Sequence, residues 1–295
     1  MKYFSKFQTV LVVATLLLSF SCSREGKYAL TDTPPLDFKS YYNGLTVTFA
    51  NQTKNATGIT WDFGDKTPVA TGDSVVHKYS ATGNYLISMT GNAEGQPWTM
   101  HTVLRVDKPS VVKLDDNSFA DWAGVAYPDF QLQGTDHMIR GKVDYDANYV
   151  YIFIEYGTAG TNGLATLNGT IMDLYMDTDN SLSTGFSSAL GADLLYEGNI
   201  PTGWFDYFTF LGTDQSQWSW NGPTTIKNAI VKGYAEEVTD TVRMEFGLSR
   251  DALKINKDVF SFKLVLNYSD WSAEAGSLSK DNDTRIVMHM DKQGK

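Results

Sequence analysis

Cysteine is almost absent from this 295-residue sequence: Cys22 is the single one, so no disulfide can form within the chain. Stability must therefore come from hydrophobic cores or from bound metal. Histidines are also few, and the four of them, His77, His101, His137 and His289, are too scattered to predict a zinc-binding cluster. The motifs of nucleophile elbows, P-loops and dinucleotide-binding turns are missing as well. We therefore expect a protein that is not an enzyme, although spatial separation alone decides whether two carboxylates can act as a glycosidase pair.

Basic residues are outnumbered by acidic ones. The chain has 24 lysines and arginines against 34 aspartates and glutamates, which gives a formal net charge of -10. Nucleic acid is excluded as an expected partner, because phosphate binding requires a basic face. Acidity of this kind is typical of an exposed, soluble surface protein.

Long apolar runs are confined to the amino terminus. Residues 10–18 follow two lysines and are too few to cross a hydrocarbon core of about 30 Å, so they predict a secretory signal peptide. The order Leu-Ser-Phe-Ser-Cys at residues 18–22 resembles a bacterial lipobox, with the leucine one position further from the cysteine than usual. We therefore predict residues 1–22 as a lipoprotein signal peptide ending in a lipidated Cys22. The alternative is that Cys22 lies beside an ordinary cleavage site.

Helical patterns are scarce too, whereas glycine, tyrosine and tryptophan are plentiful, with 25, 16 and 7 residues. Short alternating runs between turn signals favour an all-β chain. Residues 23–35 are polar and contain two prolines, which is typical of a flexible tether. Pro109 cannot donate to a β-ladder and favours a domain boundary. The sequence predicts two β-sandwich domains in tandem, residues 36–108 and residues 109–295.

The first domain contains a specific motif. Its alternating residues predict a core formed by Trp61, Phe63, Val76, Tyr79, Tyr85 and Ile87. The sequence WDFGD at residues 61–65, followed by HKY at residues 77–79 and GNY at residues 83–85, resembles a PKD domain, with Lys66 where that family usually has glycine. The resemblance implies an immunoglobulin-like β-sandwich that acts as a spacer.

The second domain contains a dense group of possible oxygen ligands. Asp177, Asp179 and Asn180 form a polar turn after one alternating run, and Asp193 opens the next run. Calcium takes six to eight oxygen ligands, and such a turn supplies several of them. The glycine and the final glutamate of an EF-hand are missing. The alternative is that Asp-rich turns simply join strands, because their side chains bond their own backbone.

The order of motifs in this domain resembles a family 9 carbohydrate-binding module and its DOMON-like relatives. The matching residues are Asp121-Trp122, Asp146 with residues 149–151, residues 177–180, Thr184-Gly185 and residues 191–193. The resemblance implies a β-sandwich in which Asp177, Asp179 and Asp193 are ligands of a structural calcium ion. One short helix is expected at residues 249–253, with Ser249 as its N-cap.

Aromatic side chains with polar neighbours are candidates for binding a sugar, whose apolar C–H faces stack on flat rings and whose hydroxyls require partners. The predicted ligand-binding residues are Trp204, Tyr207, Trp218, Trp220, Trp271, Glu197 and Asp270, with Asn199, Asp214, Gln217 and Asn221 nearby. Core burial remains an alternative for Trp218 and Trp220. Trp122, Tyr151 and Phe153 are predicted to be core residues. The calcium loop is expected to hold residues 197–204 in place beneath the sugar.

These features together resemble the surface glycan-binding proteins of Gram-negative glycan-import systems. The expected function is that of a lipid-anchored, surface-exposed outer-membrane protein that binds oligosaccharides or polysaccharides and presents them to an outer-membrane transporter complex. A surface adhesion protein that binds protein partners is the alternative. A haem-binding DOMON domain, with Met172 or Met176 and His137 or His289 as ligands, is a further alternative.

Overall fold

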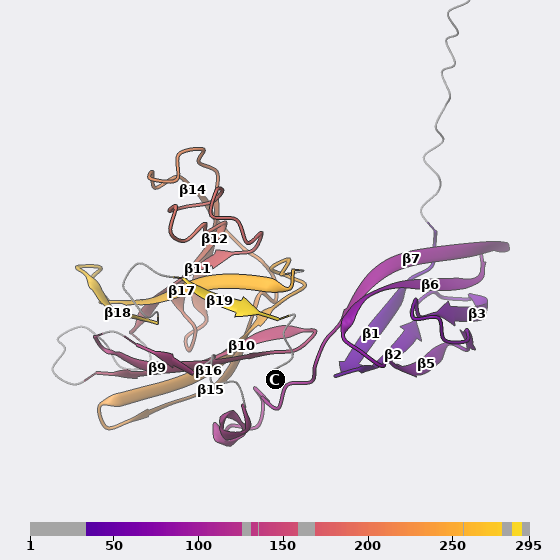
Figure 1. Ribbon diagram of the computed structural model, residues 1–295, viewed down its shortest axis with the longest axis horizontal. Coiled ribbons are helices and arrows are strands. Elements are labelled where there is room, and N and C mark those ends of the chain that lie inside the picture. Colours follow the sequence, from indigo (N-terminus) through magenta and orange to yellow (C-terminus); the bar gives the residue numbers. More distant parts are fainter. Residues whose placement is uncertain are drawn as a thin grey trace, which may run out of the picture.

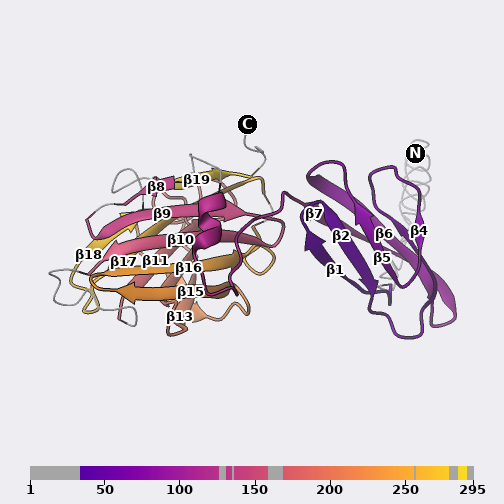
Figure 2. The ribbon, with the colours of Figure 1, turned by 90° about the horizontal axis from the view of Figure 1, so that it is seen from below.

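In the computed structural model, residues 34–125, 131–134, 136–158, 169–255, 257–278 and 285–290 are described. This part of the chain is all-β and forms two β-sandwich domains joined by a short link (Figures 1 and 2). Its single helical element is the short 3-10 helix η1 (Ala120–Gly124). No helix in the described part of the chain is long and apolar enough to span a membrane. The signal peptide, Cys22 and tether residues 23–33 lie outside the described residues.

The first domain pairs a three-stranded sheet with a four-stranded sheet, and all neighbouring strands are antiparallel. The smaller sheet has the order β1 (Phe38–Asn43), β2 (Thr46–Asn51), β5 (Ser74–Lys78). The larger one has the order β4 (Ala70–Thr71), β3 (Thr57–Asp62), β6 (Gly83–Ala93), β7 (Gln96–Val106).

The core of the first domain differs from the prediction at one position. Trp61, Phe63, Tyr79 and Ile87 are buried as predicted, and Tyr85 packs against them while partly buried. The prediction for Val76 is wrong, because its side chain is 68% exposed. Its neighbour His77 faces inward instead, with its ring stacked on Phe63 at a centroid distance of 3.9 Å and its Nε2 2.7 Å from Asp65 Oδ2. Alternation along β5 then turns Val76 to solvent.

The second domain is a sandwich of a five-stranded and a seven-stranded sheet. The five-stranded sheet has the order β15 (Ile230–Val238), β16 (Thr241–Ser249), β10 (Tyr149–Gly157), β9 (Met138–Tyr145), β8 (Gln131–Gln133). The seven-stranded sheet has the order β14 (Trp220–Thr224), β13 (Trp204–Phe210), β12 (Leu194–Asn199), β11 (Ile171–Asp177), β17 (Val259–Asn267), β18 (Glu274–Leu278), and β19 (Ile286–His289) also pairs with β17. The main hydrophobic core lies between the two sheets.

The segment after the link covers the outer side of the five-stranded sheet. Trp122 in η1 is buried and its Nε1 donates to Glu245 Oε2 at 2.6 Å. Tyr151 and Phe153 of β10 pack against it in a second small core. The predicted burial of these three aromatic residues is confirmed.

Two further expectations concern the interior and the strand ends of the second domain. Ser249 ends β16 and residues 250–254 form turns in place of the predicted helix, although Ser249 Oγ still accepts a hydrogen bond from the Ala252 amide at 3.3 Å. Met172 and Met176, which the haem alternative requires as ligands, are both buried in the hydrophobic core. Core packing is therefore a sufficient explanation for both methionines.

Alternation along β11 defines the two faces of the seven-stranded sheet. Met172, Leu174 and Met176 point into the core, so Asp173 and Tyr175 point the other way. We call this second side the open face. The segment around β14 extends from the edge of the sheet on the side away from β9, β10, β15 and β16 (Figure 1).

Candidate functional site

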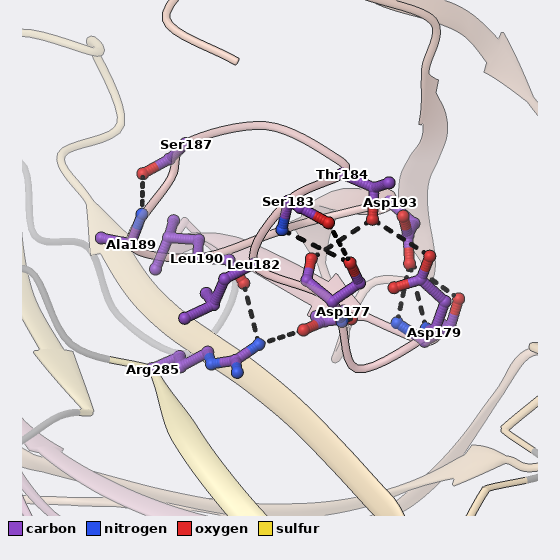
Figure 3. A network of polar contacts seen from close by, with 12 residues as sticks. Asp177, Asp179, Leu182, Ser183, Thr184, Ser187, Ala189, Leu190, Asp193 and Arg285 are labelled. Carbon is purple, nitrogen blue, oxygen red and sulfur yellow. Dashed lines mark hydrogen bonds and ion pairs between the residues drawn. The ribbon is translucent and has the colours of Figure 1, made fainter.

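The acidic loop, residues 177–193, connects β11 to β12 and brings the three predicted metal ligands together. Oxygen atoms of Asp177, Asp179 and Asp193, one from each side chain, all lie within 4.8 Å of one another (Figure 3). The three residues meet because Asp177 ends one strand and Asp193 directly precedes its antiparallel neighbour.

Hydrogen bonds within the acidic loop fix these side chains. Asp193 Oδ2 accepts bonds from the amides of Thr178 and Asp179, at 2.9 and 3.2 Å. Asp179 Oδ2 accepts a bond from Thr184 Oγ1 at 3.1 Å. Asp177 Oδ1 accepts one from the Ser181 amide at 3.2 Å. Asp179 Oδ1, in contrast, is buried and has no hydrogen-bond partner among the described residues.

The charges in the acidic loop fit a hard cation. Burial raises the pKa of the Asp177 carboxyl group, and the nearby Asp193 carboxylate also raises it, while the Ser181 amide and Arg285 lower it. Arg285 is also ion-paired with Asp177 Oδ2, and so neutralises part of the negative charge (Figure 3). Calcium binds carboxylate oxygens, and the acidic loop offers three carboxylates, of which Asp179 has a buried oxygen, Oδ1, without a hydrogen-bond partner among the described residues.

The acidic loop supports a second loop, residues 211–219, which connects β13 to β14. Gln215 Nε2 donates to the carbonyl oxygens of Leu182 and Thr184 at 3.2 and 2.8 Å, and the Ser187 amide donates to the Gln215 carbonyl at 2.9 Å. The expectation that the acidic loop holds residues 197–204 is wrong. Strand β12 runs away from the acidic loop and carries those residues to the opposite end of the sheet.

Five aromatic side chains gather on the open face next to these loops. This aromatic cluster consists of Tyr175, Phe186, Phe210, Trp218 and Trp220. The ring centroid of Trp220 lies 5.4 Å from that of Phe210, 5.6 Å from that of Phe186 and 5.9 Å from that of Trp218. Trp218 is 61% exposed, whereas Trp220 is half-buried and its Nε1 lacks a hydrogen-bond partner in the described structure.

A cleft of about 450 Å³ lies beside Trp220, formed by the loop 211–219 and the start of β14. Its polar lining includes Asp214, Gln217 and Asn221, which the sequence pointed to as polar neighbours. Asp214 Oδ1 accepts hydrogen bonds from the Ser216 hydroxyl and amide at 2.7 and 3.0 Å, and these bonds hold the pKa of Asp214 below its ordinary value. Volumes of this size are typical of small-ligand sites.

A row of carboxylates crosses the open face next to the aromatic cluster. Asp173 of β11 lies opposite Glu197 of β12, which lies opposite Asp206 of β13. Burial raises the pKa of Asp173 to about 7, against a lowering by the side-chain hydrogen bond with Asn267, and the nearby carboxylates of Glu197 and Glu274 add to the rise. Burial, followed by the carboxylate of Asp206, raises the pKa of Glu197. We call Asp173, Glu197, Asp206 and Glu274 the acidic row.

The other predicted tryptophans lie at the far end of the seven-stranded sheet. Trp204 begins β13 and is 50% exposed, while Trp271, in the turn between β17 and β18, is 48% exposed. Asp270 is exposed in the same turn and accepts a hydrogen bond from the Ser272 amide at 3.0 Å. Because β12 and β11 separate β13 from β17, the two tryptophans lie on strands roughly 14 Å apart and form no common platform in the described structure.

Tyr207 does not belong to the open face, and its prediction as a ligand-binding residue is wrong. It is 1% exposed and packs edge-on against Tyr196 in the core, because alternation along β13 turns residues 205 and 207 inward. Tyr175, Phe186 and Phe210 were not predicted. The alternation of side chains along β11 could have indicated Tyr175, because residues 173, 175 and 177 lie on the same face of the strand.

Comparisons with known proteins relate most directly to the first domain. Residues 39–106 match the PKD domain family. The resemblance read from residues 61–65 is therefore confirmed for this domain. Two similar solved structures are the PKD1 domain of Vibrio anguillarum Epp, at 23% identity, and the PKD1 domain from the Vibrio cholerae metalloprotease PrtV, at 25% identity. Each similarity covers 26% of this chain and 96% or 99% of the other, with a TM-score of 0.24.

A third similar structure extends beyond the PKD domain. It is described as one of the carbohydrate-binding modules from the β-sandwich superfamily, with promiscuous specificity. The identity is 11%, the similarity covers 74% of this chain and 91% of the other, and the TM-score is 0.24. A comparison with curated proteins found no match.

Proposed function

We propose that this chain is a cell-surface lipoprotein whose second domain binds a glycan on the open face. The observation that carries the proposal is that Trp220, whose ring contacts the exposed ring of Trp218, lines a cleft together with carboxylate and amide groups. An aromatic ring covers the apolar face of a sugar, while Asp214, Gln217 and Asn221 supply acceptors and donors for its hydroxyls.

We propose calcium as a structural ion of this site. Asp177, Asp179 and Asp193 would hold it, and the ion would supply positive charge that offsets their mutual repulsion. Through Gln215, the acidic loop supports the segment that carries Trp218. The ion would therefore affect glycan binding indirectly, by ordering the loop, and catalysis is not part of the proposed role.

The remaining parts of the chain fit this role as anchor and spacer. A lipid on Cys22 would attach the protein to the outer membrane, and the PKD domain would hold the second domain away from the surface. A transporter complex in the same membrane is the proposed recipient of the captured oligosaccharide. Support for this arrangement comes from the lipobox-like sequence and from the order of the domains.

Affinity electrophoresis in gels containing soluble polysaccharides tests glycan binding. We expect retention of the wild-type protein by at least one polysaccharide and its loss on Trp218→Ala, because most of the exposed stacking surface is removed. Trp271→Ala is the matched control, since its indole is also exposed but lies at the other end of the sheet. Absence of retention in every gel, or equal retention of wild type and Trp218→Ala, would contradict the proposal.

A further inference from the structure

The exposed ring of the aromatic cluster is inclined to both of its aromatic neighbours. The ring of Trp218 makes an angle of 67° with that of Trp220, at a centroid distance of 5.9 Å, and an angle of 83° with that of Phe186, at 5.2 Å. Tyr175 and Phe186 are closer to parallel, at 24°, but both are partly buried. A flat ligand that stacks on Trp218 therefore cannot lie flat on the ring next to it as well.

The backbone holds the two indoles in this arrangement. Trp220 is the first residue of β14, whereas Trp218 belongs to the loop 211–219. In a continuous strand, side chains two residues apart point to the same side. Here the Ser219 amide donates to the Gln217 carbonyl at 2.9 Å, which closes a tight turn at Trp218 and separates it from the regular strand.

Gly212 fixes the other end of the same loop. A Cβ on Gly212 would lie 2.5 Å from Cζ of Phe210 and 2.9 Å from Cβ of Ser219, so a larger residue would displace the ring of Phe210 or the loop. The Leu211 amide also donates to the Ser219 carbonyl at 3.0 Å. The inclination of the indoles is therefore built into the fold, and a ligand that matches it binds without the cost of reordering the loop.

The two indoles offer different surroundings to a ligand. Trp218 is 61% exposed, whereas Trp220 is partly buried and lines the cleft together with Asp214, Gln217 and Asn221. Trp220 thus combines a stacking surface with groups that accept and donate hydrogen bonds. The centroid separation of 5.9 Å is one that successive sugar rings of a single chain can span.

The linkage of a glucan decides whether its successive rings are coplanar. In a β-1,4-linked chain each ring is turned over relative to the one before it, and the chain is a flat ribbon. In an α-1,4-linked chain each ring is inclined to the one before it, and the chain winds. A wound chain can therefore place one sugar against Trp218 and the next against Trp220, while a flat chain can stack on one of them.

We propose that the open face selects wound α-1,4-linked glucans over flat β-1,4-linked ones, through the inclination of Trp218 to Trp220. This inference rests on the proposed glycan-binding function. The sugar that stacks on Trp220 would direct its hydroxyls to Asp214, Gln217 and Asn221 in the cleft.

Titration calorimetry of the full chain with two glucose hexamers tests the inference. Maltohexaose and cellohexaose contain the same sugar in the same number and differ only in the linkage, so a difference in affinity reports the shape of the chain. We expect maltohexaose to bind at least about tenfold more tightly, because it engages two rings where cellohexaose engages one.

Variants assign the selectivity to the second indole. Trp220→Ala should weaken maltohexaose binding about tenfold and change cellohexaose binding less than about threefold, because only the wound chain loses a stacking partner. Asn221→Ala, at an exposed position in the cleft, gives a second measurement in case Trp220→Ala does not fold. It should weaken maltohexaose binding about threefold and leave cellohexaose binding nearly unchanged, because a hydrogen bond to one sugar is lost.

Trp204→Ala is the matched control for these variants. Its indole is 50% exposed, as a stacking residue would be, but it lies at the opposite end of β13 from the aromatic cluster. The affinities of this variant for both hexamers should equal those of the wild-type protein.

The outcomes separate this inference from the function on which it rests. Equal affinity for the two hexamers, binding of neither, or a preference for cellohexaose, which the nearly parallel rings of Tyr175 and Phe186 would give, would overturn the selectivity. Each of these results leaves glycan binding intact if a polysaccharide gel still retains the protein. A preference that persists in folded Trp220→Ala and Asn221→Ala would also overturn the inference. Retention by no polysaccharide would overturn both proposals.

Discussion

Arg250 Nη1 lies 2.7 Å from Asp107 Oδ2, and this ion pair joins the end of β16 to the segment that follows β7. The side chains are only 4% and 1% exposed. Arg105 binds the same carboxylate through Nε at 2.9 Å, and the guanidinium of Arg250 also donates to the Asp146 carbonyl at 2.6 Å. The chain that connects the two domains is therefore held at Asp107 by a buried ion pair with the second domain, in contrast to a free hinge.

Asp107→Ala should destabilise the second domain strongly. It leaves the buried guanidinium of Arg250 without its countercharge, and breaking a buried pair in this way costs about 3–5 kcal/mol. Denaturant unfolding, followed by tryptophan fluorescence, measures the loss. Asp251→Ala is the control, because its pair with Lys254 is exposed and 3.5 Å long and should contribute less than about 1 kcal/mol. Similar losses in the two variants would show that the buried ion pair contributes no more to the free energy of unfolding than the exposed one.

Removal of calcium should lower the thermal unfolding midpoint of the wild-type protein. An ion that binds only the folded state stabilises it by about 2.7 kcal/mol when present at a hundred times its dissociation constant. Melting curves with calcium and with excess chelator measure the shift. Asp179→Asn should abolish most of it, because the unpaired Asp179 Oδ1 would no longer carry charge. An unchanged wild-type midpoint on chelation would rule out a structural ion.

Tyr207→Phe should leave glycan binding unchanged and should not destabilise the protein. The Tyr207 hydroxyl is buried without a hydrogen-bond partner among the described residues. Its removal therefore also removes the desolvation cost of an unpaired polar group. Tyr156→Phe is the matched control, because the Tyr156 hydroxyl bonds Thr170 Oγ1 at 2.9 Å and its loss should cost about 1 kcal/mol. Denaturant unfolding of both variants makes the comparison. A larger loss for Tyr207→Phe than for Tyr156→Phe would contradict the buried position of this hydroxyl.

Local patterns predicted the parts of the site that depend on neighbours in sequence. Alternation located β11 and β12, and the positions of Asp177 and Asp193 at their facing ends were sufficient to predict that the acidic residues meet. The motif at residues 61–65 likewise predicted the family of the first domain. In each case the contact is made across one loop or one hairpin.

Features that depend on distant packing could not be predicted in this way. Strand β13 has aromatic residues on both of its faces, so alternation alone did not show that Tyr207 is inside and Trp204 outside. His77 displaced Val76 from the core because its ring stacks on Phe63 and its nitrogen finds Asp65. The aromatic cluster, likewise, joins residues from three strands and two loops that the fold alone brings together.

Stability should fall as the pH rises from about 4 to about 7 because of Asp173. Burial, followed by its acidic neighbours, raises the pKa of this carboxyl group from 3.8 to about 7, so the folded chain binds a proton that the unfolded chain has lost. The unfolded state thus binds fewer protons in this window, and the free energy of unfolding decreases with pH. Asp173→Asn should remove this slope and stabilise the protein above pH 7 by on the order of 1–3 kcal/mol.

Denaturant unfolding at pH 4.5, 6 and 8 measures the effect of Asp173→Asn. Asp214→Asn is the control, because the pKa of Asp214 is lowered by Ser216 and its contribution is lost only as the pH falls through the low carboxyl range. It should keep the wild-type slope between pH 4.5 and 8. Parallel curves for wild type and Asp173→Asn would contradict the raised pKa.

Gly185→Ala should distort the acidic loop and reduce its response to calcium. Gly185 has a φ of 75°, and a Cβ there would lie 2.5 Å from the carbonyl carbon and oxygen of Gly191, so backbone must shift. Gly95→Ala is the matched control: its φ is 77°, but a Cβ would have no atom of the described structure within 4 Å. The control should cost only the left-handed backbone strain of about 1–2 kcal/mol. We expect Gly185→Ala to lose more stability than Gly95→Ala and most of the chelator-dependent shift in unfolding midpoint. Equal losses and an intact calcium response would show that the loop tolerates the added methyl group, and the close approach of Gly185 to Gly191 would then not be required for the arrangement of Asp177, Asp179 and Asp193.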